Sequence, residues 1–384
     1  MTVDRPVHLD IPAWVRPPAY ASACLGGVLP AAARACGIAV AGAPDAWNGP
    51  GGAHHAVCVV LADGLGAEQI AERPGHAPFL ARQPRHVLQA GFPSTTVASL
   101  GTLGTGLAPG VTGLAGYSLR DPATGRRTTL IGWETPTPPR VWQPHPTYFE
   151  RLAEAGSRPT FIGQHRFHRS PMTLACLRGA RFVTAGSASE RVAAAVAACA
   201  GGGVVYLYWG ELDKAGHAHG WQSRQWIEAL EVLDRAMRDL RAGLPARVAL
   251  WVTADHGMVD TDPRAAIDVA AHRALADGVT MVAGEARALH VYGDNPEAIA
   301  QRWQDFLEAD AWVMTKDDAI DLGLFGPRVA DRVMPMLGDV IVAVNGRGAI
   351  VDSRTASPAS LAMVGQHGSL TAAEMDIPLI DAAA

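Results

Sequence analysis

A pair of hydroxyl side chains, Thr95 and Thr96, follows the turn-forming Pro93-Ser94 and precedes an apolar stretch of small residues, 97–106. If that stretch is a helix, one hydroxyl lies at its N-terminus, where unpaired N–H groups favour an anion. This is a suitable position for an alcohol nucleophile. A Ser or Thr at a helix start is more often only an N-cap, so the pattern alone leaves both interpretations open.

Four further segments carry the carboxylates and imidazoles that a metal-activated hydroxyl would need. Two of them directly follow continuous apolar runs, which are typical of strands buried on both faces. Taken singly, each segment has an ordinary explanation: two polar groups on one helical face, a strand-ending turn, or a histidine in a surface loop. Together they favour a metal site. In chain order the segments contain Asp63; Asp213 and His217; Asp255 and His256; and His367.

In order and context these motifs resemble the alkaline phosphatase superfamily, and most closely its nucleotide pyrophosphatase/phosphodiesterase branch. The resemblance spans about residues 56–368, although only the five short motifs are specific. It implies two Zn²⁺ ions as cofactors, with other divalent metals possible. It also implies the ligands: Asp213, His217 and His367 for one ion, and Asp63, Asp255, His256 and the hydroxyl of Thr96 for the other.

The implied chemistry is phosphoryl transfer to a hydroxyl. Two ions about 3.5–4 Å apart can hold both the attacking and the leaving oxygen of such a displacement. The resemblance favours Thr96 over Thr95 as the nucleophile, because Thr105-Gly106 matches a Thr-Gly pair at a fixed distance after the nucleophile of the family. A metal-bound alcohol ionises readily, so no neighbouring general-base histidine is required.

One position departs from the family pattern. The resembled phosphodiesterases carry an Asn whose amide binds a phosphoryl oxygen, and alignment through Gly113 places Tyr117 there. A phenolic hydroxyl can donate the same hydrogen bond, so Tyr117 is a candidate substrate-binding residue. A tyrosine packed on the core is an equal alternative.

The resemblance implies two-metal hydrolysis of phosphodiester or pyrophosphate bonds through a covalent phospho-threonine intermediate. The expected partner is a small-molecule phosphate ester such as a nucleotide derivative. Two alternatives stay open: a phosphomonoesterase or phosphonate hydrolase of the same superfamily, and a catalytically silent metal- or nucleotide-binding protein. The oligomeric state and the leaving group do not follow from the sequence.

The elements that must position these residues follow a strand-then-helix order. Apolar runs at 56–62, 204–208 and 247–253 predict buried strands, and 189–200 and 227–240 predict helices. This order predicts an α/β fold, alkaline-phosphatase-like, with a mostly parallel doubly wound sheet flanked by helices and a small inserted αβ subdomain. The expected division is an N-terminal arm packed on the core (1–55), a metal-binding catalytic core (56–260 plus 350–384) and the insertion (261–349). Residues 117–146 show little periodicity and predict a long loop over the site.

Composition restricts the partners and the location. The 384 residues carry a net charge of −5 with no Lys/Arg block, so neither a nucleic-acid polymer nor an anionic membrane is an expected partner. The five scattered cysteines read as buried thiols rather than a disulfide framework. With no signal-like start and no long apolar span, we expect a cytoplasmic protein.

Overall fold

The computed structural model describes residues 10–41, 47 and 49–382. Its larger sheet has seven strands in the order β2-β17-β8-β1-β7-β5-β6. The five strands β8, β1, β7, β5 and β6 run parallel, whereas β17 is antiparallel to both of its neighbours. The expected mostly parallel sheet is therefore confirmed. The strands are β1 (Ala56–Ala62), β2 (Arg85–Gln89), β5 (Thr160–Gly163), β6 (Arg181–Thr184), β7 (Gly203–Trp209), β8 (Val248–Thr253) and β17 (Asp376–Asp381).

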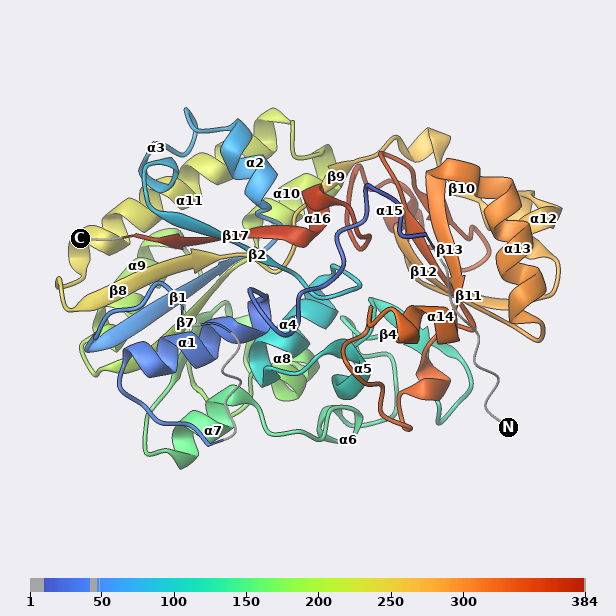
Figure 1. Ribbon diagram of the computed structural model, residues 1–384. Coiled ribbons are helices and arrows are strands. Elements are labelled where there is room, and N and C mark those ends of the chain that lie inside the picture. Colours follow the sequence, from blue (N-terminus) through green and yellow to red (C-terminus); the bar gives the residue numbers. More distant parts are fainter. Residues whose placement is uncertain (1–9, 42–46, 48, 383–384) are drawn as a thin grey trace.

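Helices cover both faces of this sheet, which explains why its central strands are continuously apolar. All seven residues of β1 are buried. Helices α9 (Ala188–Cys199) and α11 (Arg224–Gly243) lie on one face, and α1 (Val28–Ala35), α4 (Thr96–Thr105) and α7 (Tyr148–Glu154) lie on the other (Figure 1). Shorter helices connect the strands: α2 (Ala67–Glu72), α3 (Pro78–Ala81), α5 (Pro109–Thr112), α8 (Pro171–Cys176), α10 (Glu211–His219) and α16 (Ala372–Met375).

A smaller antiparallel sheet, in the order β11-β12-β14-β13, stands beside the larger one (Figure 1). Both faces of this smaller sheet are buried, as strand β14 shows. Val340, Val342 and Val344 pack with helix α13 in a separate core, whereas Ile341 and Ala343 join the main core. The expected αβ insertion thus has its own sheet and still packs firmly on the rest of the molecule. Its elements are β11 (Val279–Glu285), β12 (Ala288–Gly293), β13 (Ala311–Thr315), β14 (Val340–Val344), α12 (Arg273–Ala276), α13 (Pro296–Leu307) and α14 (Lys316–Asp321).

Two short strand pairings lie where the chain passes into the smaller unit and returns from it. Strand β16 (Gly365–Gln366) pairs with β9 (Val259–Asp260), and β15 (Ile350–Val351) pairs with β10 (Ile267–Asp268). Ile350 packs in the core of the smaller sheet. Residues 350–351 therefore pair and pack with the smaller sheet, and the expected division into arm, catalytic core and insertion stays a prediction. A short helix, α15 (Pro358–Leu361), follows.

The stretch 117–146 is more regular than expected. It contains a hairpin of β3 (Ser118–Arg120) and β4 (Arg127–Thr129), followed by helix α6 (Pro139–Trp142). The turn is closed by Asp121, whose Oδ1 accepts the N–H of Ala123 at 2.8 Å, and by Gly125 at φ 69°. Three-residue strands are too short to leave a period-2 pattern, but Asp121-Pro122 followed by Gly125 is a turn signal that the periodicity analysis missed.

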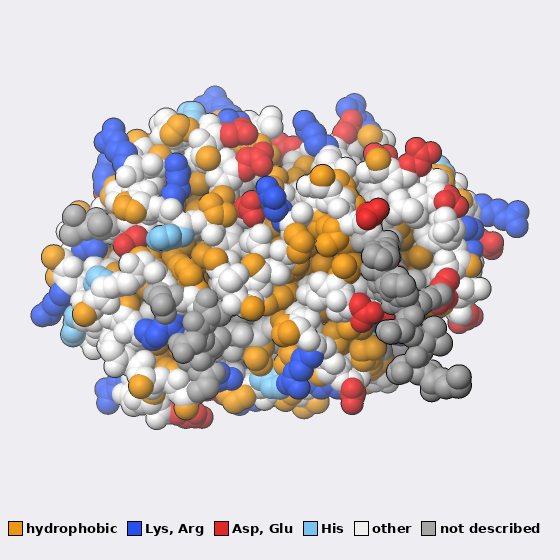
Figure 2. All heavy atoms as spheres, viewed as in Figure 1, with side chains coloured by type: hydrophobic (Ala, Val, Ile, Leu, Met, Phe, Trp, Pro, Cys, Tyr) orange, Lys and Arg blue, Asp and Glu red, His pale blue; other side chains and the backbone are white. Residues whose placement is uncertain are grey.

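Surface chemistry agrees with the composition. On the face shown in Figure 2, Lys and Arg side chains are scattered among Asp and Glu and form no single patch. In the part of the chain that the structure describes, none of the helices has the length and apolar character needed to cross a bilayer. All five cysteines are free, and only Cys36 is not fully buried. The cytoplasmic location stays a prediction.

Candidate metal centre and nucleophile

The carboxyl ends of three neighbouring parallel strands bring most of the candidate residues together. Asp63 follows β1, Asp255 follows β8, and helix α10 with Asp213 follows β7. Backbone bonds hold these loops to one another: Asp63 N–H donates to Trp209 O at 2.9 Å, and Asp213 N–H donates to Asp63 O at 3.1 Å. Gly64 N–H donates to Asp255 Oδ1 at 3.1 Å. The candidate carboxylates therefore converge at the edge where open α/β sheets place their sites.

The three candidate histidines meet at this edge. The rings of His256 and His367 are stacked, with centroids 3.6 Å apart and planes 14° apart. His367 Nε2 lies 3.3 Å from His217 Nε2. His367 comes from the segment after β16, so a part of the chain beyond the smaller unit completes the cluster.

Each imidazole is oriented by a backbone carbonyl. The Nδ1 atoms lie 2.7 Å from Gly365 O for His217, 2.9 Å from Gly257 O for His256, and 2.9 Å from Ser94 O for His367. A carbonyl oxygen only accepts, so each Nδ1 carries the proton and each Nε2 of the neutral ring has a free lone pair. This is the arrangement by which a protein prepares histidine as a metal ligand.

The donor set fits divalent cations. Two groups have ligand atoms that all lie within 4.8 Å of one another: Asp213 with His217 and His367, and Asp63 with Asp213 and His256. The buried oxygens Asp213 Oδ1 and Asp255 Oδ2 have no hydrogen-bond partner among the described residues. Asp255 Oδ2 also lies 3.6 Å from His256 Nε2. Unpaired carboxylate oxygens facing unprotonated nitrogens leave room for positive charge, which two adjacent ions would supply.

Charge crowding in this cluster is severe. Burial, and next the carboxylates of Asp255 and Asp213, raise the pKa of Asp63 well above its usual range. Burial, followed by the neighbouring His256 and His217, lowers the pKa of His367 well below its usual range. The cluster thus disfavours both the anionic form of Asp63 and the cationic form of His367, and bound cations would relieve the repulsion between its carboxylates.

The two adjacent threonines play different structural roles. Thr95 is buried and is the N-cap of α4, its hydroxyl accepting the N–H of Ala98 at 3.4 Å. Thr96 is partly exposed, and its Oγ1 lies 3.2 Å from His256 Nε2 and 3.5 Å from Asp63 Oδ1. The two interpretations of the hydroxyl pair therefore fall on different residues, with Thr95 serving as the cap and Thr96 facing the cluster.

Tyr117 lies at the edge of the smaller unit. Its N–H donates to Glu285 Oε2 at 2.9 Å, and the residue is 40% exposed. Its hydroxyl has no hydrogen-bond partner among the described residues, and the exposure rules out the alternative of a tyrosine packed on the core. A role of this hydroxyl in binding substrate stays a prediction.

Sequence reasoning missed the role of Tyr208, and it left open whether the segment that carries Arg166 and Arg169 reaches the site. Tyr208, near the end of β7, donates its hydroxyl to Asp63 Oδ2 and so orients a candidate ligand. The segment after β5 also reaches this edge, because the ring of Phe167 lies 5.0 Å from that of Tyr208 and Arg166 Cζ lies 4.8 Å from the ring of Phe167. Tyr208 lies at the carboxyl end of β7 and the other segment follows β5, and that position at the sheet edge was the signal available for finding them.

One protein family matches most of the chain. The model of the family type I phosphodiesterase/nucleotide pyrophosphatase matches residues 57–170 and 180–370. No curated protein sequence matches the chain.

Several solved structures share the fold. Human ectonucleotide pyrophosphatase/phosphodiesterase 5 is 18% identical, with a TM-score of 0.64 over 85% of this chain and 87% of that chain. The murine protein, as an inactive variant in complex with AMP, is 18% identical, with a TM-score of 0.64 over 84% of this chain and 87% of that one. Phosphonoacetate hydrolase from Sinorhizobium meliloti 1021, in complex with phosphonoacetate, is 18% identical, with a TM-score of 0.64 over 85% of this chain and 89% of that one.

Proposed function

The chain belongs to the type I phosphodiesterase/nucleotide pyrophosphatase family, and from this premise we propose that it hydrolyses phosphodiester or pyrophosphate bonds of a small-molecule phosphate ester such as a nucleotide derivative. The observation that carries the proposal is the position of Thr96 Oγ1, at the N-terminus of α4 and 3.2 Å from His256 Nε2. A partly exposed hydroxyl beside the buried ligands Asp63 and His256 is a suitable nucleophile.

The proposed cofactors are two Zn²⁺ ions. The residues that would hold them are Asp213, His217 and His367 for one ion, and Asp63, Asp255 and His256 with Thr96 for the other. Divalent ions bound there would lower the pKa of the Thr96 hydroxyl and stabilise negative charge on the phosphoryl oxygens.

In the first proposed step, the Thr96 hydroxyl gives up its proton to solvent and Oγ1 forms a bond to phosphorus. The bond from phosphorus to the leaving-group oxygen breaks, and that oxygen keeps the electron pair and takes up a proton from solvent. Unpaired N–H groups at the start of α4 favour the anionic phosphoryl group. A water molecule then attacks phosphorus and the bond to Thr96 breaks, which restores the hydroxyl and releases the phosphate product. Tyr208 keeps Asp63 oriented throughout, because its hydroxyl donates to Asp63 Oδ2.

A phosphonate hydrolase is the second candidate, and the segment after β5 favours it. Arg166 and Arg169 are exposed, and neither has a carboxylate partner among the described residues. Their neighbour Phe167 contacts Tyr208 and so lies close to the candidate ligands. A substrate with a carboxylate in addition to its phosphorus group would find positive charge there. The related fold solved with phosphonoacetate makes that compound a natural probe.

The discriminating measurement is kcat/KM on zinc-loaded protein at one pH. The substrates are bis-p-nitrophenyl phosphate, a nucleotide ester, p-nitrophenyl phosphate and phosphonoacetate. We expect the diesters to exceed the monoester by about tenfold or more, because a diester carries one charge less and needs room for a second substituent. A preference for p-nitrophenyl phosphate would indicate a monoesterase. A preference for phosphonoacetate that Arg166→Ala abolishes would select the second candidate, and no turnover at all would indicate a silent binding protein.

A further inference from the structure

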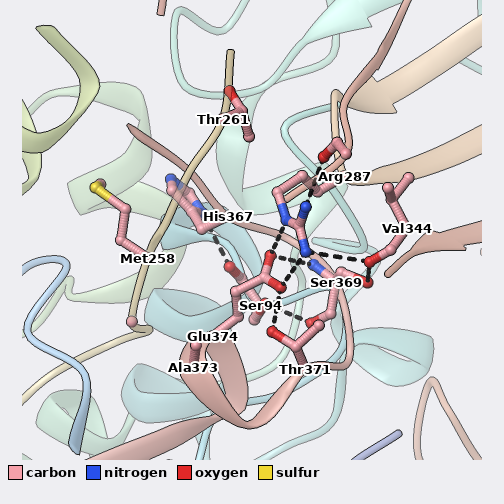
Figure 3. A network of polar contacts seen from close by, with 12 residues as sticks. Ser94, Met258, Thr261, Arg287, Val344, His367, Ser369, Thr371, Ala373 and Glu374 are labelled. Atoms are coloured by element: carbon pink, nitrogen blue, oxygen red, sulfur yellow. Dashed lines mark hydrogen bonds and ion pairs between the residues drawn. The ribbon is translucent and has the colours of Figure 1, made fainter. Parts of the chain in front are cut away.

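The hairpin between β11 and β12 inserts its tip into the main body of the molecule. The tip residue Arg287 is 0% exposed, although it carries a permanent positive charge. Its guanidinium donates to both carboxylate oxygens of Glu374, at 2.7 and 2.8 Å, and to the carbonyls of Gly348 at 2.6 Å and Val344 at 3.1 Å. Glu374 is also 0% exposed and belongs to α16, next to the larger sheet. A fully buried ion pair thus joins the smaller unit to the main body (Figure 3).

The carboxylate of Glu374 organises the segment that carries His367. Its Oε1 also accepts the N–H of Ser369 at 3.0 Å, and its Oε2 accepts the hydroxyl of Thr371. Ser369 Oγ in turn donates to Val344 O at 2.7 Å. Residues 367–371 form no helix and only the end of a short strand pairing precedes them, so these contacts satisfy backbone groups that regular structure does not.

This segment is bonded to the nucleophile segment. Ser94, two positions before Thr96, donates its hydroxyl to Ser369 O at 2.7 Å and its N–H to Gly368 O at 2.9 Å. In the opposite direction, His367 Nδ1 donates to Ser94 O at 2.9 Å. Figure 3 shows this chain of contacts running from Arg287 through Glu374 and Ser369 to Ser94 and His367.

Helix α16, which carries Glu374, also supports the loop that follows His256. Gly257 N–H donates to Glu374 O at 2.9 Å, and Met258 N–H donates to Ala373 O at 3.1 Å. These residues directly follow His256. The backbone and the side chain of Glu374 therefore support two candidate metal ligands that come from different loops.

We propose that Arg287 and Glu374 are a positioning pair for the metal centre: seating the β11–β12 hairpin tip fixes His367 and His256 in ligand geometry relative to Thr96. The inference rests on the proposed function, because it concerns the metal site assigned there. Neither residue contacts a candidate ligand atom or the nucleophile, so both act through the segments they hold. Tight metal binding then requires the smaller unit, because its hairpin tip holds the ligand segments in place.

The test measures Zn²⁺ affinity by competition with a chromogenic chelator in Arg287→Lys, Glu374→Gln and the double variant. Arg287→Lys keeps the charge but loses the two-pronged contact, and Glu374→Gln keeps the size but loses the charge. We expect each single variant to weaken zinc binding about 10–100-fold, the range typical of residues that orient metal ligands. The double variant should bind zinc as tightly as the weaker-binding single variant, because the two residues act as one unit.

A matched control separates positioning from general destabilisation. Arg178 and Glu150 form another ion pair, with Arg178 Nε 2.9 Å from Glu150 Oε2 and a nearly buried arginine, in contact with the segment 143–147 and not with the ligand loops. Arg178→Lys and Glu150→Gln should lower the melting temperature about as much as Arg287→Lys and Glu374→Gln do. Their zinc affinity should stay within about twofold of that of the wild type, because Arg178 and Glu150 touch no group that orients a ligand. Ser94→Ala removes only one contact between the two segments and serves as the variant most certain to fold; about a tenfold loss of affinity is expected.

The outcomes are distinct. If the wild type binds no zinc, the proposed function fails and the positioning role fails with it. If the wild type binds zinc and Ser94→Ala, Arg287→Lys and Glu374→Gln retain its affinity, the pair is structural only and the inference is overturned while the proposed function stands. If those variants lose affinity and the control pair does not, the inference is supported.

Discussion

Replacing Thr96 by alanine removes the hydroxyl that lies 3.2 Å from His256 Nε2 and leaves the six carboxylate and imidazole ligands in place. Because the side chain is partly exposed and does not cap the helix, little stability depends on it. If it is the nucleophile, its loss should lower kcat by about 10⁴–10⁶-fold, as expected when a covalent mechanism loses its attacking atom. Folding and metal content should change little.

The neighbouring Thr95→Ala variant should behave in the opposite way. It removes the N-cap bond to Ala98 N–H, which at 3.4 Å is long for a hydrogen bond. We expect a loss of about 0.5–1 kcal/mol in the free energy of unfolding, the lower part of the range for N-caps. That corresponds to a fall of roughly 1–3 °C in melting temperature for a protein of this size. Turnover should stay within about threefold of the wild type, because the hydroxyl faces the helix and not the ligand cluster.

The assay compares the two variants with the wild type under identical conditions. Turnover of bis-p-nitrophenyl phosphate by zinc-loaded protein gives kcat, thermal unfolding gives stability, and mass spectrometry after acid quench detects a phosphoryl group on the chain. The reasoning is refuted if Thr96→Ala keeps more than about a tenth of the wild-type kcat, since a missing nucleophile cannot leave such activity. It is also refuted if Thr95→Ala, rather than Thr96→Ala, abolishes turnover.

Two further predictions concern the metal content and the pH dependence of stability. Elemental analysis after zinc reconstitution and desalting should find two divalent ions per chain, because one tetrahedral ion cannot use six ligands; a value at or below one would contradict the site. Burial lowers the pKa of His290 to about 4, and the neutral ring is held by Ala115 O at 2.9 Å and Gly338 N–H at 3.0 Å. A lowered pKa means that this histidine stabilises the fold above pH 6.5 and that the contribution is lost as the pH falls through 4, by roughly 3 kcal/mol in total. Denaturant unfolding with a chelator present should show this loss in the wild type and a smaller one in His290→Gln; equal slopes would contradict the argument.

The residues of the site that follow buried strands could be predicted because their signal is local. A continuous apolar run identifies β1 and β8, and the acid that ends each run must lie at the same edge of a parallel sheet as the others. The predicted strand at 56–62 coincides with β1 for the same reason. The choice of Thr96 depended on the family motif, because the local sequence suits a cap at either threonine.

The partners that orient the ligands could not be predicted, because each lies far away in the sequence. The contact of Tyr208 with Asp63 exists only once β7 has paired with β1. Before folding, an aromatic residue near the end of an apolar strand is indistinguishable from a core residue. The β3–β4 hairpin escaped for a different reason, since three residues per strand are too few to show a period.

The pair formed by Arg287 and Glu374 shows why the smaller unit belongs to the candidate site and is not an appended module. His367 follows that unit in the sequence, and its segment has no regular structure that would hold it beside His256. A buried arginine and glutamate are costly unless each finds its complete set of hydrogen bonds, and that set exists only when the hairpin tip, α16 and the His367 segment are all in place. Folding of the smaller sheet, docking of its tip and completion of the ligand cluster are therefore coupled steps. A chain with every family motif intact but an altered hairpin tip would keep its ligands and lose the geometry that makes them a site.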